Sequence, residues 1–393
     1  MSMVVADKYA LEIPHRQGYS ILIHDDKEGE DRMSVWFILL AAVAALGLGA
    51  LFYLVTRVRR FSCLRRLAET HRGLSWLLAA GAVGLLFLFG FVNLYAVFIV
   101  VLHLALFWLL CDLVAGVVKR IRHKEPRRYY AGAVAVLLTA LYLGAGWAAA
   151  HRIRETDYTV ETQKATDPLR VVLMADAHLG VTLDGDGFTA TMARIEALRP
   201  DVVVMVGDYV DDDSTRADML AASRALGALE TTYGVYYVYG NHDNGYFRHR
   251  DFTAQELRAA LTESGVTILE DETALLGDGY ALIGRRDRSS AGRLSMAELL
   301  PGPSQRFTIV LDHQPNDYDA QAAAGADLVL SGHTHGGHIF PAWLIGLWIR
   351  ANDATYGLSR RGDTTFIVTS GLSGWAIPFK TGAFSEFVVI DIQ

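Results

Sequence analysis

The sequence predicts a two-part protein, in which an all-α transmembrane module precedes an α/β domain. Three observations lead to this prediction. Long apolar runs fill much of the first 150 of 393 residues, and short β-rich runs alternate with helical patterns after residue 168. Five of those β-rich runs end in polar clusters of the metal-ligand type. The apolar content of 52% is therefore an average over two unlike halves.

Four apolar segments predict the transmembrane module, at residues 34–56, 74–92, 94–111 and 129–150. Each has about the ~20 apolar residues that a bilayer-spanning helix needs. Buried helices of a soluble protein are a poor alternative for four such runs, and the runs are too long and too many for a signal peptide. The sequence thus predicts a polar tail at 1–32, a four-helix module at 33–150 and a linker at 151–168. Met33 leaves open a start directly before the first helix.

The distribution of Lys and Arg predicts the orientation. Basic residues gather between the first and second segments and between the third and fourth, whereas the second connection has none. Basic loops remain cytoplasmic, so we expect an integral protein of the cell membrane with residues 169–393 outside the cytoplasm. His103 and Asp112 lie within or at the end of the third segment. A functional role for them stays open, although Asp112 at the basic side is more simply the end of the span.

The two halves also differ in charge. Residues 1–150 carry 16 basic and 10 acidic residues, whereas residues 151–393 carry 20 and 33. So acidic a C-terminal half argues against nucleic acid as a partner and suits a domain that collects divalent cations. Cys63 and Cys111 are the two cysteines, so the C-terminal half has neither a disulfide framework nor a cysteine nucleophile.

The C-terminal half predicts an α/β domain of residues 169–393. Five β-rich runs begin near residues 169, 201, 234, 307 and 327, and helical patterns separate the early ones. This spacing predicts right-handed crossovers and a largely parallel first sheet. Later β-rich runs at 275–276, 280–283, 365–369 and 387–392 predict a second sheet packed on the first.

Each of the five runs leads into a polar cluster, and sites in parallel sheets form at the carboxyl ends of strands. The clusters therefore converge on one edge, bringing together Asp176, His178, Asp208, Asn241, His242, His313, His333 and His335. Carboxylates, imidazoles and an amide without a thiolate favour Mn, Fe or Zn. Seven candidate ligands, counted without His242, exceed what one open site needs, so we expect two divalent ions, which Asp208 could bridge. The acidic run at 211–213 is more simply a solvated loop, and His338 has an open role.

Asp-x-His, Gly-Asp, Gly-Asn-His-Asp, a lone His and Gly-His-x-His, in this order, resemble the calcineurin-like metallophosphoesterase superfamily over roughly residues 169–391. The resemblance implies a four-layer α/β/β/α sandwich with a two-metal site. It implies that Asp208 bridges the ions and that His242, paired with Asp243, is the catalytic histidine. It assigns one ion to Asp176, His178 and His335, and the other to Asn241, His313 and His333.

Ser-Gly-His-Thr-His-Gly-Gly further resembles a bacterial envelope branch that includes the YkuE- and YaeI-type phosphodiesterases. This chain has His338 where that branch usually has Gln, and Lys380 in place of an Arg after Pro378. The resemblance does not cover the transmembrane module.

These observations together predict a membrane-anchored phosphoesterase that cleaves phosphodiester or pyrophosphate bonds in envelope lipids or wall polymers. Metal-activated hydroxide would attack phosphorus. His242 would protonate the leaving oxygen, and Asp243 would orient His242 or cap its loop. The alternatives are a non-enzymatic receptor or scaffold with a metal-stabilised domain, and a phosphatase for soluble nucleotides or phosphoproteins. The oligomeric state stays open.

The apolar run at 339–349 follows the last histidine cluster directly and contains Trp343 and Trp348. Trp prefers the membrane interface, so the run predicts a membrane-presented, lipid-linked substrate. The alternative is that the run is part of the core.

Overall fold

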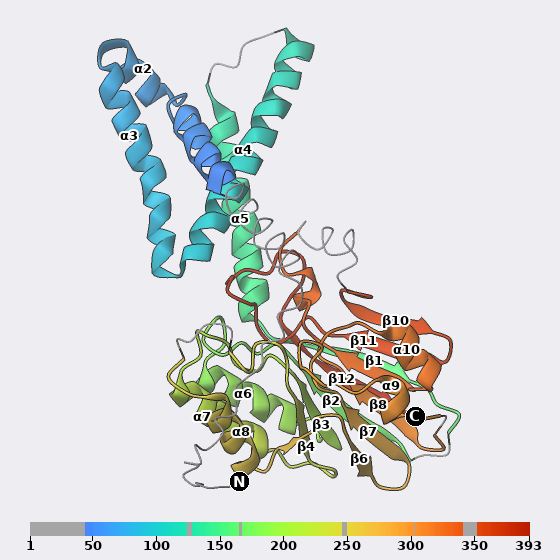
Figure 1. Cartoon of the computed structure of the whole chain (residues 1–393). Helices are drawn as coiled ribbons and strands as arrows, with labels where there is room; N and C mark the ends of the chain where they lie inside the picture. Colours follow the sequence, from blue (N-terminus) through green and yellow to red (C-terminus); the bar gives the residue numbers. More distant parts are fainter. Residues whose placement is uncertain (1–43, 124–127, 165–166, 246–249, 303, 341–351) are drawn as a thin grey trace, which may run out of the picture.

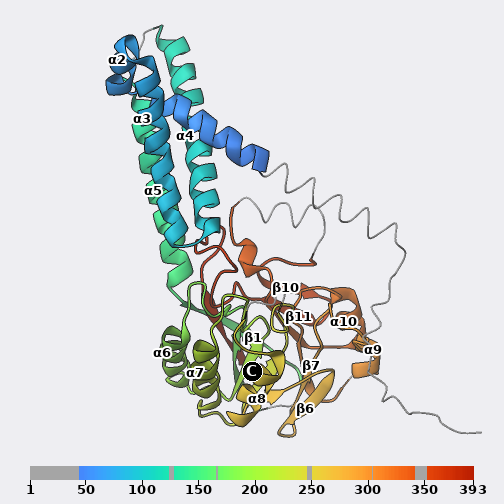
Figure 2. The ribbon, with the colours of Figure 1, turned by 60° about the vertical axis from the view of Figure 1, so that its left-hand side comes forward.

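The computed structural model describes residues 44–123, 128–164, 167–245, 250–302, 304–340 and 352–393. Long helices stand on a two-sheet α/β domain, and α5 leads from one part into the other (Figure 1). In the second view the helices form a column above the sheets (Figure 2).

Within the described residues, three helical stretches are long and apolar enough to cross a membrane. They are residues 72–91, formed by α3 (Arg72–Gly84) and η1 (Leu85–Phe91), then α4 (Leu94–Arg122) and α5 (Tyr130–His151). The first predicted span lies partly outside the described residues, and its described part is the shorter apolar helix Ala44–Val58. A short helix, α2 (Ser62–Thr70), follows it. The long apolar helices indicate a membrane protein, whereas the count of four spans stays a prediction.

Asp112 does not end the third helix, because α4 continues to Arg122. Its carboxylate pairs with Arg57 at 2.8 Å and Arg60 at 3.2 Å and accepts a hydrogen bond from the Tyr129 hydroxyl at 2.6 Å. An acidic side chain with such partners can lie inside an apolar helix. Asp112 therefore joins helix Ala44–Val58 to α4 and to the start of α5.

Twelve strands of the described part of the chain form two six-stranded sheets. The first sheet has the order β1 (Arg154–Val160), β12 (Glu386–Ile392), β2 (Leu169–Met174), β3 (Val202–Val206), β4 (Val235–Val238), β5 (Thr267–Ile268). The second has the order β10 (Gly357–Arg361), β11 (Thr364–Val368), β9 (Leu328–Ser331), β8 (Phe307–Leu311), β7 (Tyr280–Gly284), β6 (Glu272–Leu276). Strands β2 to β5 are parallel, as are β7, β8, β9 and β11. The two parallel sets run their carboxyl ends toward one edge of the sandwich.

The layers are helices, sheet, sheet, helices. One apolar core lies between the first sheet and α6 (Gly185–Glu196), α7 (Arg216–Gly227) and α8 (Ala254–Glu263). A second core lies between the two sheets, and a third lies between the second sheet and α9 (Met296–Leu299) and α10 (Tyr318–Ala324). The predicted α/β/β/α sandwich after an all-α module is confirmed.

The structure corrects the assignment of strands to sheets. The runs at 307–311 and 328–331 were expected in the first sheet but form β8 and β9 of the second, and the run at 387–392 forms β12 of the first. Strand partners are remote in sequence, as in the ladder between β12 and β2. Local patterns therefore identify a strand without identifying its sheet.

The expected linker at 151–168 also differs. Residues Arg154–Val160 form β1, an edge strand that pairs in parallel with β12. Its side chains are mostly exposed and polar, and such edge strands lack the apolar pattern of a buried one. The last membrane helix thus leads almost directly into the sheet.

Residues 373–382, named here the docking loop, connect the domain to the helices. Asn93 donates a hydrogen bond from Nδ2 to the Ala376 carbonyl at 2.7 Å, and the Lys380 amide donates to the Gly146 carbonyl at 2.9 Å. Phe379 of the same loop is buried with Leu143 and Val100 of the membrane helices. The docking loop therefore packs on the domain end of both α4 and α5.

Candidate metal centre

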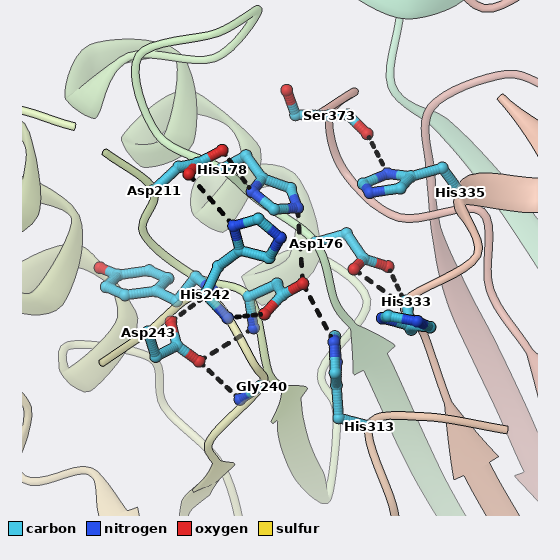
Figure 3. A network of polar contacts seen from close by, with 12 residues as sticks. Asp176, His178, Asp211, Gly240, His242, Asp243, His313, His333, His335 and Ser373 are labelled. Atoms are coloured by element: carbon cyan, nitrogen blue, oxygen red, sulfur yellow. Dashed lines mark hydrogen bonds and ion pairs between the residues drawn. The ribbon is translucent and has the colours of Figure 1, made fainter. Parts of the chain in front are cut away.

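All the predicted site residues lie in turns that follow five parallel strands. Asp176 and His178 follow β2, Asp208 follows β3, Asn241 and His242 follow β4, His313 follows β8, and His333 and His335 follow β9. Figure 3 shows the side chains of these turns pointing toward one another. Two sheets contribute, so the centre lies at the shared edge of the sandwich.

The backbone at these strand ends is strained. Asp176, His178, Asp208, His333 and His335 are five of the eleven non-glycine residues with positive φ in the described chain. Each such residue costs about 1–3 kcal/mol, and such strain collects at functional sites. Gly207 precedes Asp208, and a Cβ on it would lie 2.5 Å from Nδ1 of His313. Glycine there lets the β3 and β8 turns approach closely.

The described residues contain three groups of side chains that could hold a cation. One of them, His178, Asp211 and His242, shares His178 with a second group, and the remaining two groups have no residue in common. Asp176, His178 and His335 form one group, and Asp208, His313 and His333 form the other, with potential ligand atoms within 4.8 Å of one another in each. Oδ2 of Asp208 lies 3.0 Å from Nε2 of His313 and 3.7 Å from Nε2 of His178. One carboxylate thus faces both groups, as the predicted bridge requires.

Hydrogen bonds orient three of the imidazoles. Nδ1 of His313 donates to the Val206 carbonyl at 2.8 Å, and Nδ1 of His335 lies 3.2 Å from the Ser373 carbonyl. Nδ1 of His178 lies 3.1 Å from Oδ2 of Asp211. A carbonyl or carboxylate at Nδ1 leaves the lone pair on Nε2, the nitrogen that a metal then takes.

The donor set fits divalent metals. Nε2 of His178 and of His313 are buried and have no hydrogen bond within the described part of the chain, although an unsatisfied buried polar atom is costly. Asp176 and Asp208 are fully buried carboxylates. Burial raises the pKa of Asp176 to about 6. Imidazole nitrogens at 3.0 and 3.7 Å from a buried carboxylate form a mixed set of nitrogen and oxygen donors, which suits a divalent cation.

His242 lies beside the two groups and is held by Asp211. Nδ1 of His242 is 3.2 Å from Oδ1 of Asp211, whose other oxygen faces His178. Burial lowers the pKa of His242, but the hydrogen bond with Asp211 and the charge of Asp208 outweigh burial, so the net pKa is raised. A raised pKa favours the protonated ring, the form that a general acid needs.

Asp211 is a site residue that the sequence interpretation missed. The sequence predicts a solvated acidic run at 211–213, yet Asp211 is 4% exposed. Burial raises its pKa, but hydrogen bonds with His178 and His242 outweigh burial and hold the pKa below its ordinary value. The available signal was its place three residues after Asp208, still in the turn after β3.

Asp243 has a different role from the one expected. Its buried carboxylate accepts hydrogen bonds from the backbone amides of Asp208, Tyr209, Val210 and Gly240, at 2.7–3.2 Å. The His242 ring hydrogen-bonds with the carboxylate of Asp211. Asp243 therefore joins the β3 and β4 turns as a loop cap, the alternative that the sequence left open.

The docking loop forms one rim of the centre. The Trp375 ring lies 5.3 Å from the His242 ring between centroids, and the Ser373 carbonyl faces His335. Buried Lys380 donates from Nζ to the Ser370 and Gly371 carbonyls, and burial lowers its pKa to about 7. Nε2 of His338 donates a hydrogen bond to the Ile377 carbonyl at 3.1 Å. His338 therefore helps to hold the docking loop.

Residues 341–351 lie outside the described residues, and Trp343 and Trp348 with them. The two described residues of the apolar run differ in burial. Ile339 is buried with Phe379, whereas Phe340 is 48% exposed.

Buried carboxylates and imidazoles gather at the shared edge of the two packed sheets. This arrangement is typical of metal-dependent hydrolases. The family model described as calcineurin-like phosphoesterase matches residues 169–337. An Aquifex aeolicus metallophosphoesterase is 31% identical over 48% of this chain and 72% of its own length. The chain belongs to the calcineurin-like phosphoesterase family.

Two further relatives extend the comparison. The metallophosphoesterase YkuE of Bacillus subtilis is 27% identical over 65% of this chain and 92% of its own length. A transmembrane protein with metallophosphoesterase domain from Danio rerio is 29% identical over 66% of this chain and 62% of its own length. The chain spans about 64% of the length of the relatives from Helicobacter pylori that it matches.

Proposed function

We propose that this protein is a membrane-anchored phosphodiesterase or pyrophosphatase with two divalent ions, acting on lipid-linked substrates of the cell envelope. The observation that best supports a hydrolase activity is the pair of ligand groups that meet at Asp208, with His242 beside them. A receptor or scaffold would have no need for the Asp211–His242 pair.

Divalent ions bound by the two groups would supply an activated water and neutralise the phosphoryl oxygens. Asp176, His178 and His335 would hold one ion, and Asn241, His313 and His333 the other, with Asp208 between them. The protein's own part begins with the Asp211–His242 pair. Asp211 keeps the His242 ring in place with its proton on the side of the leaving oxygen, and His242 then donates that proton.

The packing of the docking loop on the helices supports a lipid-linked substrate. The loop that forms the rim of the centre also contacts α4 at Asn93 and α5 at Gly146. A phosphoester in a membrane surface would then reach the centre without leaving the bilayer. A soluble nucleotide gains nothing from this arrangement.

The position of the basic residues supports an extracytoplasmic domain. Figure 1 shows α2 and the end of α4 at the end of the helical module that is far from the sheets. Both carry basic residues, such as Arg65 on α2 and Arg120 on α4. Basic residues stay cytoplasmic, so the domain would lie on the opposite side of the membrane.

The test is hydrolysis of bis-p-nitrophenyl phosphate and of p-nitrophenyl phosphate by the purified full-length protein. We expect turnover of the diester that exceeds turnover of the monoester, that stops in excess chelator and that returns when Mn²⁺ is added. Unchanged turnover in the chelator would contradict the metal centre, and preference for the monoester would contradict a diesterase.

A further inference from the structure

Besides the metal centre, the molecule has an apolar cavity of about 530 Å³ among the membrane helices. Its walls come from η1, α4 and α5, and the docking loop contributes one residue at the domain end. Among the lining residues are Leu86, Phe89, Val100, Leu104, Leu143 and Phe379. Its volume lies within the usual range of ligand sites, about 300–1,000 Å³.

The cavity offers a ligand almost nothing polar. Thr139 is the one hydroxyl residue of the described lining, and it donates its hydrogen to the Ala135 carbonyl of its own helix at 2.8 Å. Small residues on α5, Ala140 and Gly144, form part of the hollow. A site within membrane helices that offers so few hydrogen-bonding groups favours hydrocarbon.

The length of the cavity suits a chain rather than a compact ligand. Its lining on α5 runs from Val136 to Trp147, which is about 16 Å of helix at the usual rise of about 1.5 Å per residue. Trp147 lies at the domain end, with its ring edge-on to Phe379 at 5.6 Å. Trp prefers the membrane–water interface, so this end lies where a lipid changes from chain to headgroup.

A short series of contacts connects the cavity to the metal centre. Phe379 closes the domain end, and Ile377 packs with it. The Ile377 carbonyl pairs with His338, whose ring lies 5.3 Å from that of the candidate ligand His335. The same loop holds Trp375 against His242. One segment of ten residues thus borders both the apolar cavity and the reacting end.

We infer that the cavity between η1, α4 and α5 binds the hydrocarbon chain of a lipid phosphoester while its phosphate lies at the metal centre. The inference rests on the proposed function and adds the place where the chain binds. The occupant is the substrate's own chain, since the cavity ends at the loop that borders the centre.

The test compares two diesters with the same leaving group, dodecyl p-nitrophenyl phosphate and methyl p-nitrophenyl phosphate, on the full chain in detergent. We expect wild-type protein to prefer the dodecyl ester in kcat/KM by at least roughly tenfold, because burial of each added methylene is favourable. Gly144→Phe should remove most of this preference and leave turnover of the methyl ester unchanged. A Cβ at Gly144 meets no atom within 4 Å, so the new ring can enter the cavity.

Gly81→Phe is the matched control. Gly81 also lies in an apolar helix, also has open space around a Cβ and does not line the cavity, so this variant should keep the preference. Ala140→Leu, a smaller change in the same cavity, replaces Gly144→Phe if that variant loses methyl-ester turnover and therefore its fold.

The outcomes separate the two proposals. Three outcomes would overturn the hydrocarbon-chain site and leave the proposed phosphodiesterase intact. They are equal wild-type rates on both esters, a preference for the dodecyl ester that survives filling of the cavity, and an equal loss of preference in the Gly81 control. If a cavity variant lowers the melting temperature without changing the preference for the dodecyl ester, the protein's own side chains fill the cavity. Hydrolysis of neither ester would contradict the proposed phosphodiesterase, and the hydrocarbon-chain site with it.

Discussion

The two oxygens of Asp211 hold two different imidazoles, the candidate ligand His178 and the candidate acid His242. Asp211→Asn keeps one acceptor and puts a donor in place of the other, so one of the two rings loses its partner. Because such supporting residues are usually worth about 10–100-fold, we expect kcat on a soluble diester to fall by a factor in that range. Steady-state kinetics of the diester hydrolysis measure this.

The neighbouring exposed carboxylate provides the control, since Asp213→Asn removes the same charge from the same turn outside the centre. Equal kcat for the Asp211 variant and the Asp213 variant would show that the charge of the turn matters and the pairing does not.

Variants of Asp208 and of His242 should distinguish the loss of metal binding from the loss of proton transfer. We expect Asp208→Asn to lose metal and activity together, because the carboxylate that faces both ligand groups loses its charge. His242→Ala should keep its metal and lose activity by about 10²–10⁴-fold, the usual contribution of a general acid. Elemental analysis alongside kinetics distinguishes the two, and equal metal loss in both would make His242 a ligand.

Most of the candidate site was predictable from the sequence, because each residue stands directly after a short apolar run and is of a ligand type. The sequence misses the role of Asp211 and leaves two roles open for Asp243, for a common reason. Both are acidic residues in polar turns, and no local pattern tells a carboxylate that binds an imidazole from one that binds backbone amides. The difference arises where the β3 and β4 turns meet.

At the scale of elements, close approach between turns depends on glycine. A Cβ on Gly240 would overlap the carboxylate and the amide of Asp208. We expect Gly240→Ala to displace Asp208 and to reduce both metal content and activity. Gly265→Ala is the control: it introduces a Cβ at a positive φ with nothing within 4 Å, and it should lower stability by about 1 kcal/mol while sparing metal content. Full metal content in the Gly240 variant would contradict the packing described for these turns.

The junction of the docking loop with α4 has its own test. Asn93 caps α4 with Oδ1, which accepts from the Ala96 amide, and contacts the docking loop with Nδ2. Asn93→Ser retains a good N-cap and loses the bond to Ala376, which is worth about 0.5–1.5 kcal/mol. We expect faster hydrogen exchange at the Lys380, Thr381 and Gly382 amides and unchanged exchange in β2. Unchanged exchange in the docking loop would show that this bond does not hold it.

Elements with a local signal were found from the sequence, and those with a distant partner were misplaced. Among the described residues, the stretch 72–91 and helix α5 lie close to their predicted bounds, because about twenty consecutive apolar residues indicate a membrane helix. Helix α4 continues past its predicted end at residue 111 and finishes at Arg122. Strand β1 was read as linker because an exposed edge strand is polar, and β12 was put in the wrong sheet because its partners, β1 and β2, are more than two hundred residues away.

At the scale of the whole molecule, the orientation across the membrane is the prediction with the widest consequences. A reporter that is active only outside the cytoplasm, fused after Gln393, should be active, and one that needs the cytoplasm should be inactive. The same reporters inserted between Arg122 and Arg128 should give the opposite pattern. A reversed result at both positions would place the metal centre in the cytoplasm and remove the envelope as its site of action.

The most direct test of the central claim is a metal titration of the apoprotein, with bound Mn²⁺ and diester turnover measured on the same samples. The geometry around Asp208 predicts two ions per chain, with turnover near zero in the apoprotein and reaching its plateau only as the second ion binds. Full turnover without metal, or a plateau at one ion per chain, would contradict a two-ion centre.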